Sequence, residues 1–590
     1  MNPPRNPAPS YWRPSIAGAR VRSTTVARPQ LDYKWIALSN TTLGVFMAFA
    51  NTSIVLIAMP AIFQGIGVDP LAPAETNYFL WLFLGYMVVT ASLLVTCGRI
   101  SDLYGRVRLY NLGFAVFTLG SLLLTLTPAS GNTAALQLIL YRIVQGLGAS
   151  FLFANSAAIL TDAFPSNERG MAMGFNQVAA IVGSLAGMIL GGVLATIHWR
   201  LVFLISVPVG AFGTVWAYRK LRETARPAQH PQIDWVGNVL FAVGLTILLL
   251  AITYGIQPYG AEPMGWTNPT VIGGVVLGLA LLATFVAVEH RVSQPMFRLE
   301  LFRIRMFTAA NASNFLASLA RGGLQFMLII WLQGIWLPLH GYSYEETPLW
   351  AAIYMIPMLV GFAVAGPVCG WLSDRLGSRG LTTGGMLLNV AGFAGMMTLP
   401  ANFTYVWFAG WLVVLGVGQG MFAAPNTSAI MNSLPTEHRG AGSGMRATFQ
   451  NAAMLLSIGL FFSIVIVALA RQLPPVLAGG LEREGLPAAA ATQVAHVPPT
   501  AALFAAFLGY NPMGSLVPKD MLSQIPHHAR AKLLGQEFFP QLIAEPFMTG
   551  LRWAFAVSAA MCAIAAVASL LRGRRPRQIT VTPPTPADPG

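Results

Sequence analysis

Charged residues are scarce in this sequence. Asp, Glu, Lys and Arg make up 9% of its 590 residues, whereas hydrophobic residues make up 55%. Soluble domains carry roughly 25% charged residues, so a soluble enzyme with a single membrane anchor is excluded. Apolar runs of about 20 residues, each long enough to cross a bilayer as a helix, fill most of the chain. The sequence therefore predicts an all-α polytopic membrane protein.

Cysteine is almost absent, and the three cysteines are far apart. Cys97, Cys369 and Cys562 each lie in or beside an apolar run, and there is no Cys-x-x-Cys or Cys/His cluster with metal-ligand spacing. Neither a disulfide scaffold nor a metal site is therefore expected. The sequence also has no glycine-rich P-loop, so neither ATP as an energy source nor a cofactor is implied.

Positive charge exceeds negative charge, and its distribution predicts the topology. The formal net charge is +14, but the basic residues are spread over many short loops, so no nucleic-acid partner is expected. Most of the 35 Lys and Arg residues lie in alternate loops and in the two tails. Because short cytoplasmic loops collect Lys and Arg, both termini are predicted to be cytoplasmic. The expected location is the plasma membrane, as a multi-pass protein of a bacterial inner membrane.

Fourteen apolar segments separated by polar breaks are predicted to span the membrane. Their cores are 35–63, 78–97, 109–126, 134–160, 176–197, 201–218, 236–256, 271–288, 307–337, 349–372, 381–399, 405–431, 452–470 and 551–571. The predicted organisation is a basic tail (1–33), six spans (34–220), two spans (221–291), five spans (292–471), an extracytoplasmic loop (472–548), a last span (549–572) and a tail (573–590).

Two short charged segments between apolar runs have nearly the same pattern. GRISDLYGRVR (98–108) is followed about 270 residues later by GWLSDRLGSRG (370–380), and PSNERGMAMG (165–174) is followed at a similar distance by PTEHRGAGSG (435–444). Two matches at one offset predict a duplicated helical bundle. Secondary transporters often have such repeats, because one half can rock against the other to give alternating access.

The residue types of the first charged segment suit a tight turn at a membrane surface. Gly98 and Gly105 are expected to allow the turn and a close approach of helix ends. Arg99, Arg106 and Arg108 are expected beside anionic lipid headgroups. Asp102 lies near a helix end, where it can accept hydrogen bonds from the first N–H groups of a neighbouring helix. From the residues alone, the segment is either a gate or a topological anchor.

Four segments together resemble one family. The first charged segment resembles the loop signature of the major facilitator superfamily between its second and third spans, and YRIVQGLGA (141–149) resembles the fourth-span motif of that superfamily. LGVFMAFANTSIVLIAMPAI (43–62) and WLQGIW (331–336) resemble the fourteen-span drug–proton antiporter branch. The resemblance covers nearly the whole chain. It implies a major facilitator fold of two six-helix bundles, with 236–256 and 271–288 as two extra spans between them.

In the family that the sequence resembles, the charged loop latches the two halves at the cytoplasmic side when the transporter faces outward. The resemblance therefore gives a set of candidate latch residues from both charged segments. They are Gly98, Arg99, Asp102, Gly105, Arg106, Gly370, Asp374, Gly377 and Arg379.

Two arginines are expected inside spans, where charged side chains are costly and usually functional. Arg142 shares a helix face with Gln145 and Gly146. The resemblance assigns Arg142 to a proton or substrate pathway; an arginine held by backbone carbonyls is the alternative. Arg321 belongs to no family motif. Its side chain could either contact an anionic or polar substrate or pair with a backbone carbonyl. The candidate pathway residues are Arg142, Gln145, Gly146, Asn51, Arg321 and Gln333.

Glycines recur in the fifth predicted span at Gly183, Gly187 and Gly191. Glycines four residues apart form a smooth stripe on one helix face, which predicts close helix packing. The antiporter branch has a Gly-Pro pair where Gly187 and Met188 stand here, so this helix is expected to bend less.

Acidic residues are absent from the middle of every predicted span. The antiporter branch usually carries an aspartate where Asn51 stands, and Asn51 cannot titrate. Proton coupling would then run through Asp102, Asp162 or the surroundings of Arg142. A cationic drug would also find no counter-charge in mid-membrane, so neutral, anionic or lipid-like amphiphiles are the expected substrates.

The expected function is that of a secondary active transporter. The main hypothesis is efflux of amphiphilic drugs or related small molecules by proton antiport. The alternative is a lipid or glycolipid translocator, or a metabolite transporter without proton coupling. No nucleophile, metal site or carboxylate pair on facing spans indicates an intramembrane enzyme, and no repeated filter indicates a channel. Expected partners are a small amphiphilic substrate, membrane lipids and protons, with the chain acting as a monomer.

Overall fold

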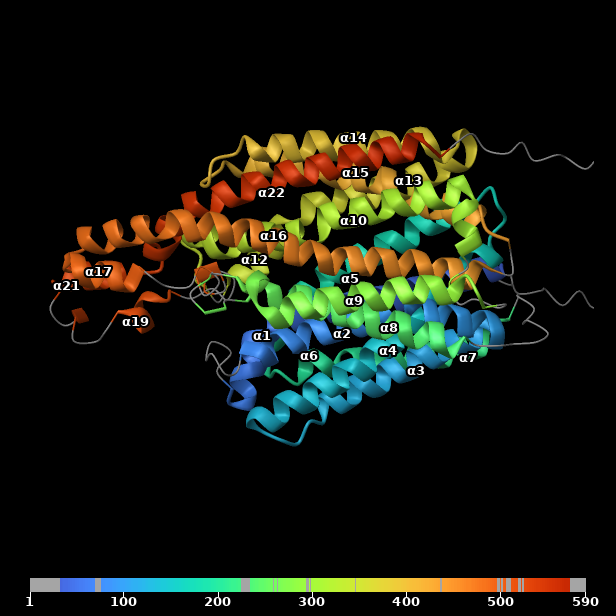
Figure 1. Cartoon of the computed structure of the whole chain (residues 1–590), viewed down its shortest axis with the longest axis horizontal. Coiled ribbons are helices and arrows are strands. Elements are labelled where there is room, and N and C mark those ends of the chain that lie inside the picture. Colours follow the sequence, from blue (N-terminus) through green and yellow to red (C-terminus); the bar gives the residue numbers. More distant parts are fainter. Residues whose placement is uncertain are drawn as a thin grey trace, which may run out of the picture.

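A computed structural model describes residues 32–572, and the predicted tails 1–31 and 573–590 lie outside the described residues. The internal positions outside it are 69–75, 224–233, 258, 261, 263, 293–296, 298, 345, 436–437, 496–498, 500–501, 504, 506–510, 518–520 and 523–524. The described chain forms a bundle of long, roughly parallel helices with a smaller group of helices projecting from one end (Figure 1).

The first repeat has six spanning elements, the last of which is broken. They are α1 (Tyr33–Ile66), α2 (Thr76–Tyr104), α3 (Arg106–Thr125), α4 (Gly131–Ala163), α5 (Arg169–Ile197) and the pair α6 (Leu201–Leu204) and α7 (Ser206–Lys220). Gly105, between α2 and α3, has φ 110°, a conformation that only glycine adopts readily.

The second repeat follows the same order, with two interrupted elements. They are α10 (Arg305–Trp331) with the π-helical segment η3 (Leu332–Trp336) and α11 (Leu337–Leu339), α12 (Thr347–Tyr354) with α13 (Ile356–Leu376), α14 (Ser378–Met397), α15 (Tyr405–Asn432), α16 (Arg439–Arg483) and α22 (Phe538–Leu570). Gly377, between α13 and α14, has φ 89°. Both charged segments therefore turn at a glycine with positive φ.

Two extra helices lie between the repeats in the sequence. They are α8 (Trp235–Gly255) and α9 (Pro269–Glu289), with the 3₁₀ turns η1 (Gly265–Thr267) before α9 and η2 (Leu299–Arg303) after it. Asp234 starts α8 by accepting a hydrogen bond from the N–H of Gly237 at 2.8 Å, and Asn268 starts α9 by accepting from Thr270 at 2.9 Å. Such caps satisfy N–H groups that have no partner within the helix. The two helices pack on each other, and α8 also contacts α2 and α16.

The number of spans agrees with a polytopic membrane protein. In the described part of the chain, 13 helices are long and apolar enough to cross a membrane. α14 stands where the remaining expected span falls, has 20 residues and packs against α15 and α22. It is rich in Gly and Thr, which lowers its hydropathy without removing it from the bundle (Figure 1).

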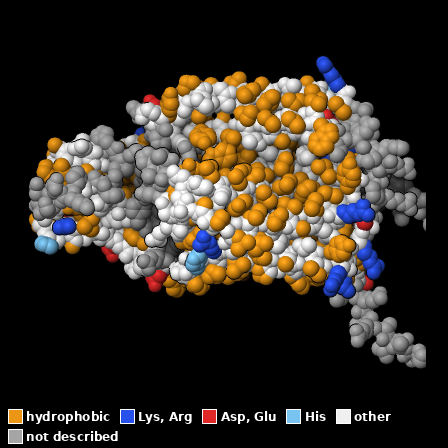
Figure 2. Space-filling model, turned by 90° about the horizontal axis from the view of Figure 1, so that it is seen from below, with side chains coloured by type: hydrophobic (Ala, Val, Ile, Leu, Met, Phe, Trp, Pro, Cys, Tyr) orange, Lys and Arg blue, Asp and Glu red, His pale blue; other side chains and the backbone are white. Residues whose placement is uncertain are grey.

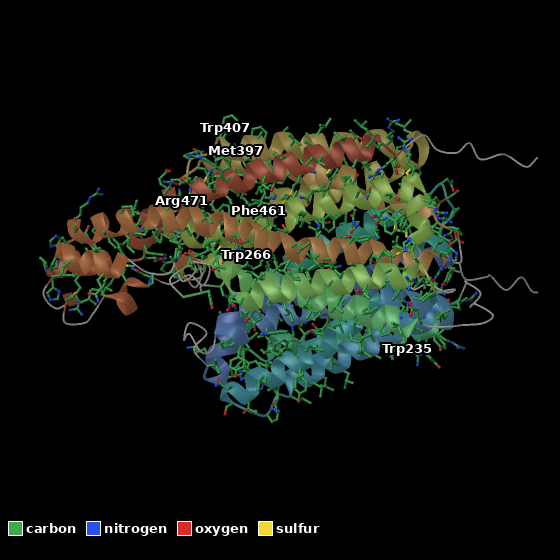
Figure 3. The ribbon with its side chains drawn as sticks, in the orientation of Figure 1. Trp235, Trp266, Met397, Trp407, Phe461 and Arg471 are labelled. Atoms are coloured by element: carbon green, nitrogen blue, oxygen red, sulfur yellow. The ribbon has the colours of Figure 1, made fainter. Side chains whose placement is uncertain are left out.

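The surface and the ends of the bundle fit a membrane-spanning orientation. In the face shown in Figure 2, hydrophobic side chains cover the middle, and most of the visible Lys and Arg lie at the end opposite the projecting helices. Exposed tryptophans lie near opposite ends, Trp235 at one and Trp407 at the other (Figure 3), as expected at membrane–water interfaces. The end with Asp102 and Asp374 is called the basic end below, and the other the extension end.

The predicted loop 472–548 is largely helical where it is described. α16 continues past Arg471 (Figure 3) to Arg483, and α22 begins at Phe538 instead of near 549. Between them lie α17 (Ala488–Ala495), α19 (Met513–Leu516) and α21 (His527–Leu533). The 45 residues of α16 would extend about 67 Å, more than twice the hydrocarbon core of a bilayer. The extension therefore continues two spanning helices beyond the membrane.

The extension is attached to the loop that joins α11 and α12. The Tyr344 hydroxyl donates to the carbonyl of Gln536 at 2.9 Å, and the Gln536 amide donates to the carbonyl of Tyr342. Burial raises the pKa of the Tyr344 phenol, which keeps it a hydrogen-bond donor. The extension is thus fixed to the second repeat.

Candidate functional site

At the basic end, Asp102 reaches from the first repeat to a helix of the second. Asp102 lies in the last turn of α2, and its Oδ2 accepts a hydrogen bond from the N–H of Ala441 at 2.7 Å. Ala441 is in the first turn of α16, where N–H groups lack helical partners and carry partial positive charge. The side chain of Asp102 is only 4% exposed, so this is a buried contact between the halves.

Asp374 makes the corresponding contact in the opposite direction. It lies near the end of α13, and its two carboxylate oxygens accept from the N–H of Gly170, in the first turn of α5, at 3.1 and 3.0 Å. α5 and α16 are the fifth spanning helices of the two repeats. A Cβ on Gly370 would lie 2.7 Å from the carbonyl carbon of Gly170, so glycine permits this close approach. The two repeats therefore hold each other by the same contact made twice.

The arginines of this region pair with buried carboxylates. Arg106 pairs with Asp102, Nη2 to Oδ1 at 2.8 Å, and also with Asp162. The structure differs here from the expectation that Arg99 and Arg106 lie beside lipid headgroups, because both side chains are buried. For Arg106, Asp102 and Asp162 offset the cost of removing its charge from water.

A second pair of contacts crosses between the halves. Nη1 of Arg439 lies 3.1 Å from Oδ1 of Asp162, and Nη1 of Arg169 donates to Oδ1 of Asn432 at 2.7 Å. Arg169 and Arg439 occupy matching positions in the two repeats, as do Asp162 and Asn432. Of these two contacts between the halves, Arg439–Asp162 is therefore an ion pair and Arg169–Asn432 is a hydrogen bond to a neutral amide.

Two of the candidate latch residues do not join this interface in the same way. Gly98 is buried within α2, and Arg379 is exposed near the start of α14. In the second charged segment Ser378 stands where Arg106 stands in the first. The second segment thus keeps the aspartate and the turn glycine but not the buried arginine.

Arg142, Gln145 and Asn51 lie together in the core of the first repeat. Nη1 of Arg142 donates to Oδ1 of Asn51 at 2.5 Å and to Oε1 of Gln145 at 2.6 Å, and its Nε donates to the carbonyl of Leu82 at 3.3 Å. The guanidinium also lies 4.3 Å from the ring centre of Tyr86. Arg142 is fully buried, so it is held on several sides by its own half.

Gly146 lets α2 and α4 approach each other beside this network. A Cβ on Gly146 would lie 3.0 Å from the carbonyl oxygen of Tyr86. The glycines of α5 act in the same way toward α1: Gly183 faces Phe46, Gly187 faces Ala50 and Gly191 faces Ile54.

Gln333 lies apart from the other candidate pathway residues. It is buried in the π-helical segment η3, near the extension end. There the indole N–H of Trp336 donates to the carbonyl of Phe403 at 2.9 Å. The structure therefore places Gln333 near the extension end, about three helical turns beyond Arg321 along the same spanning element.

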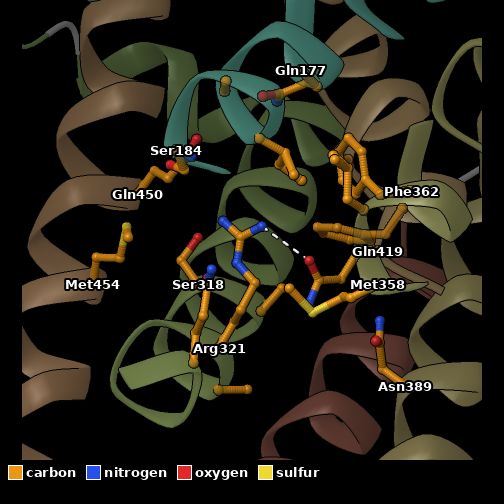
Figure 4. Close-up of a pocket in the computed structure, with 18 of the residues that line it drawn as sticks. Gln177, Ser184, Ser318, Arg321, Met358, Phe362, Asn389, Gln419, Gln450 and Met454 are labelled. Atoms are coloured by element: carbon orange, nitrogen blue, oxygen red, sulfur yellow. Dashed lines mark hydrogen bonds between the residues drawn. The ribbon is translucent and has the colours of Figure 1, made fainter. Parts of the chain in front are cut away.

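A cavity lies between the two halves near the middle of the bundle (Figure 4). Arg321, on α10, points into it, and Nη1 donates to Oε1 of Gln419, on α15, at 3.2 Å. The space open to the centre of a water molecule is about 100 Å³. Other polar lining side chains are Gln177, Ser184, Asn314, Ser318, Gln325, Asn389 and Gln450.

A second lobe of similar size adjoins this cavity on the side of the first repeat. It measures about 110 Å³ and shares Phe49, Ser184, Met188, Gln325 and Met454 with the first lobe. Its remaining lining is mostly apolar and aromatic: Leu56, Phe83, Tyr86, Met87, Phe153, Phe326, Ile329 and Ile458, with Thr52, Ser53, Thr90, Gly322 and Asn451. The two adjoining lobes are together called the chamber below; many of the side chains that line the first are polar, and most of those that line the second are apolar.

Several site residues were not expected from the sequence. Arg446 falls in the polar break between the predicted spans 405–431 and 452–470. In the structure α16 begins at Arg439, so Arg446 lies two turns inside the helix and donates to Gln450 at 2.8 Å. Gln419 and Gln450 have no motif, and only the rotation of their helices brings them to the cavity. Met side chains spaced along several helices were the one available sequence signal for an adaptable cavity lining.

These features define a multi-pass membrane transporter built from two related helical bundles around a central chamber. Residues 41–458 match the Major Facilitator Superfamily, and the chain belongs to that superfamily. Its members are transporters, in agreement with the class that the sequence predicted.

Relatives with assigned names agree with this family. The chain is 29% identical over 437 residues to the riboflavin transporter RibZ of Clostridioides difficile (strain 630), covering 73% of this chain and 88% of that protein. It is 26% identical to multidrug resistance protein 3 of Bacillus subtilis (strain 168), covering 75% of this chain and 81% of that protein. It is also 26% identical to the tetracenomycin C resistance and export protein of Streptomyces glaucescens, covering 91% of each.

A solved structure shows the same fold. A bacterial homolog of the human lysosomal transporter Spinster, in an inward-facing and unoccupied conformation, matches with a TM-score of 0.51 and 15% identity. The match covers 93% of this chain and all of that one.

Proposed function

We propose that this protein is a secondary active exporter of amphiphilic small molecules that works by alternating access. The observation that carries the proposal is a chamber of mixed polarity between two related halves, beside a basic end that two reciprocal carboxylate contacts hold together. A chamber of this kind suits a ligand with one polar and one apolar part. Methionines at Met188, Met358, Met386 and Met454 give it a lining that can adapt to several shapes.

The two contacts at the basic end act as the gate in this proposal. Rocking one half against the other would separate Asp102 from Ala441 and Asp374 from Gly170 together, because the repeat relates the two contacts. The Arg439–Asp162 and Arg169–Asn432 contacts would break in the same motion. The remaining candidate latch residues shape the turns that carry these groups.

The basic end is proposed to face the cytoplasm. The support is the concentration of Lys and Arg in the loops at this end, as cytoplasmic loops show. α1 starts there and α22 ends there, so both termini would be cytoplasmic. A monomer suffices for the proposed cycle, because one chain forms the whole chamber.

Proton antiport is the proposed source of energy, and the basic end is its proposed site. Among the described residues, no carboxylate lines either lobe of the chamber, whereas Asp102 and Asp162 are buried at the basic end. A protonated Asp102 would lose the charge that strengthens its bonds to Ala441 and Arg106. Proton binding would thus loosen the gate.

A metabolite transporter without proton coupling is the second candidate. It is favoured by the 29% identity to a protein named as a riboflavin transporter. Flux measurements in proteoliposomes separate the candidates, since only antiport makes addition of substrate change the internal pH.

The test of the export proposal is a comparison of cells with and without the protein. Accumulation of a panel of fluorescent amphiphiles is measured with the proton gradient intact and after an uncoupler. We expect lower accumulation of at least one amphiphile in producing cells, and the difference should vanish with the uncoupler. Equal accumulation of every member in both strains would refute export.

A further inference from the structure

We infer that the chamber selects amphiphiles with an anionic group, and that Arg321 binds this group. This inference rests on the proposed function and names the substrate class of the same site. A carboxylate, phenolate, sulfonate or phosphate would meet the guanidinium, and the apolar body of the molecule would lie in the second lobe.

The charge of Arg321 has no opposite charge beside it in the chamber. Arginine remains protonated inside proteins, and among the described residues that line the two lobes none is Asp or Glu. The contact from its guanidinium to Gln419 is a hydrogen bond of 3.2 Å to a neutral amide. Burying a charge without a charged partner in a membrane-spanning bundle costs free energy. An anionic ligand would offset this cost by pairing with the guanidinium.

Arg142 shows how the same fold holds an arginine that is not open to a ligand. Asn51, Gln145 and the carbonyl of Leu82 accept its hydrogen bonds, and it is fully buried. Arg321, in contrast, retains accessible surface that faces the cavity. One arginine is thus enclosed by its own half, and the other is presented to the space between the halves.

The repeat makes this contrast specific. In the first half the arginine is on the fourth spanning helix, α4, and its amide partner Asn51 is on the first, α1. In the second half the arginine is on the first spanning helix, α10, and its amide partner Gln419 is on the fourth, α15. The chain therefore carries an arginine–amide pair between the same two helices in each half, with the two roles exchanged, and only the pair of the second half lines the chamber.

Neighbouring amides add donors toward an anion. Oε1 of Gln419 accepts from Arg321, and Oε1 of Gln450 accepts from Arg446 at 2.8 Å. Their carbonyl oxygens are therefore occupied, and their NH₂ groups are the ends that remain for a ligand. Both glutamines line the first lobe together with Arg321, so this lobe offers hydrogen-bond donors and a positive charge to the polar group.

The apolar lobe provides the other half of the recognition. Phe83 and Phe326 lie with ring centres 6.1 Å apart, and they line the second lobe with Met87 and Ile458. The lobes share Gln325 and Met454 as lining residues, so the apolar lobe directly adjoins the polar one. The present volumes suit a small ligand, and a larger one would require the halves to separate.

The experiment uses the full-length protein in lipid nanodiscs and three matched fluorescent probes. The probes share one naphthalene ring and one alkyl chain, and end in a sulfonate, a neutral amide or a trimethylammonium group. For the unchanged protein, we expect the sulfonate probe to bind at least about tenfold more tightly than the trimethylammonium probe, as one charge-assisted hydrogen bond would give.

Variants of Arg321 test whether this side chain sets the preference. Arg321→Gln should abolish the preference for the sulfonate, Arg321→Lys should keep most of it, and Arg321→Glu should reverse it toward the trimethylammonium probe. The matched control is Arg219→Gln, which removes the same charge at an exposed position at the end of α7 and should change nothing. A reversal cannot come from misfolding, so Arg321→Glu is the strongest arm.

The outcomes separate this inference from the proposed function. If the unchanged protein binds and exports the three probes equally, or if Arg321→Gln keeps the full preference for the sulfonate, the exporter stands and the anion inference is wrong. If no probe is bound or moved, both fail. If the Arg321 variants do not fold, two other measurements test the inference. The unchanged protein must prefer the sulfonate probe, and Gln450→Met must bind that probe several-fold more weakly. Absence of either result overturns the inference.

Discussion

The carboxylate of Asp374 accepts the N–H of Gly170 with both of its oxygens, at 3.1 and 3.0 Å, across the boundary between the two halves of the protein. Asp102 accepts the N–H of Ala441 with one oxygen, Oδ2, at 2.7 Å, while its Oδ1 accepts from Arg106. Each half therefore supplies one carboxylate and one helix start to the other. If one half rocks against the other at this end, as we propose, both contacts must be lost.

Removing the charge of Asp102 is expected to weaken the closed basic end. In Asp102→Asn the amide oxygen can still accept from Ala441, but a neutral hydrogen bond is roughly half as strong as a charged one. We expect transport to fall about tenfold while membrane abundance stays the same, since a loss of roughly 1.4 kcal/mol corresponds to that factor. Substrate flux in vesicles, normalised to protein amount, provides the measurement.

Asp234→Asn is the matched control for this variant. Asp234 also accepts from a helix N–H, that of Gly237 at 2.8 Å, but it does so within one of the two extra helices. Flux should be unchanged in this control. Normal flux in Asp102→Asn at normal abundance would contradict the gating role.

A charge added at Asn432 is expected to strengthen the closed basic end. Arg169 donates to Asn432 at 2.7 Å, whereas its repeat partner Arg439 pairs with the carboxylate of Asp162. Asn432→Asp would make the two crossings alike, and a charged contact in place of a neutral one should slow transport several-fold by favouring the closed state.

Protease or thiol-reagent access to the basic end measures this effect. Access should decrease in Asn432→Asp and increase in Asn432→Ala. Unchanged access together with unchanged flux in both variants would show that this contact does not hold the halves together.

The glycine stripe of α5 is expected to be required for packing on α1. A Cβ on Gly187 would lie 2.9 Å from the Cα of Ala50, whereas a Cβ on Gly192 would meet nothing within 4 Å. Gly187→Ala should therefore cost about 1–3 kcal/mol through overpacking, and Gly192→Ala should be neutral or slightly stabilising. The melting temperature of each purified variant is measured by size-exclusion chromatography after heating. Equal melting of the two variants would disprove close packing at Gly187.

Loss of the amide at Asn51 is expected to destabilise the first half. Its Oδ1 accepts from Arg142 at 2.5 Å, so Asn51→Leu leaves part of a buried cation unsatisfied, at a cost of about 1–3 kcal/mol or more. Asn51→Asp should restore stability because it gives Arg142 a charged partner. Melting temperature is the readout, with Thr42→Val as control, since the Thr42 hydroxyl bonds within its own helix. A melt of Asn51→Leu equal to that of the unchanged protein would contradict the account.

Much of the fold could be predicted because its signals are local. Apolar runs give the spans, and two matching charged segments give the repeat, independently of any contact between helices. The start of α16 was misplaced because the polar sequence from Arg439 to Arg446 reads as a loop, although packing between the halves supports a helix there. In the same way, 472–548 reads as a loop because it is not apolar enough to span.

The site could be predicted only in part, because its contacts depend on distant helices. The sequence indicated Asp102, Asp374, Arg142 and Arg321, since charges between or inside apolar runs stand out. It could not indicate that Asp162 faces Arg439 or that Gln419 faces Arg321, because those pairs depend on how helices are rotated and placed. Gln333 shows the converse: a residue in a family-like motif lies near the extension end, away from Arg321.

Opening of the basic end is the central claim, and a distance across it is the most direct test. Spin labels at Tyr104 and Leu376, exposed residues at the ends of α2 and α13, report this distance when the three native cysteines are replaced by alanine. We predict a short distance that gives way to a second, longer one during turnover, with the longer one enriched in Asp374→Asn. A single distance that stays the same with substrate, without it and in Asp374→Asn would contradict the claim.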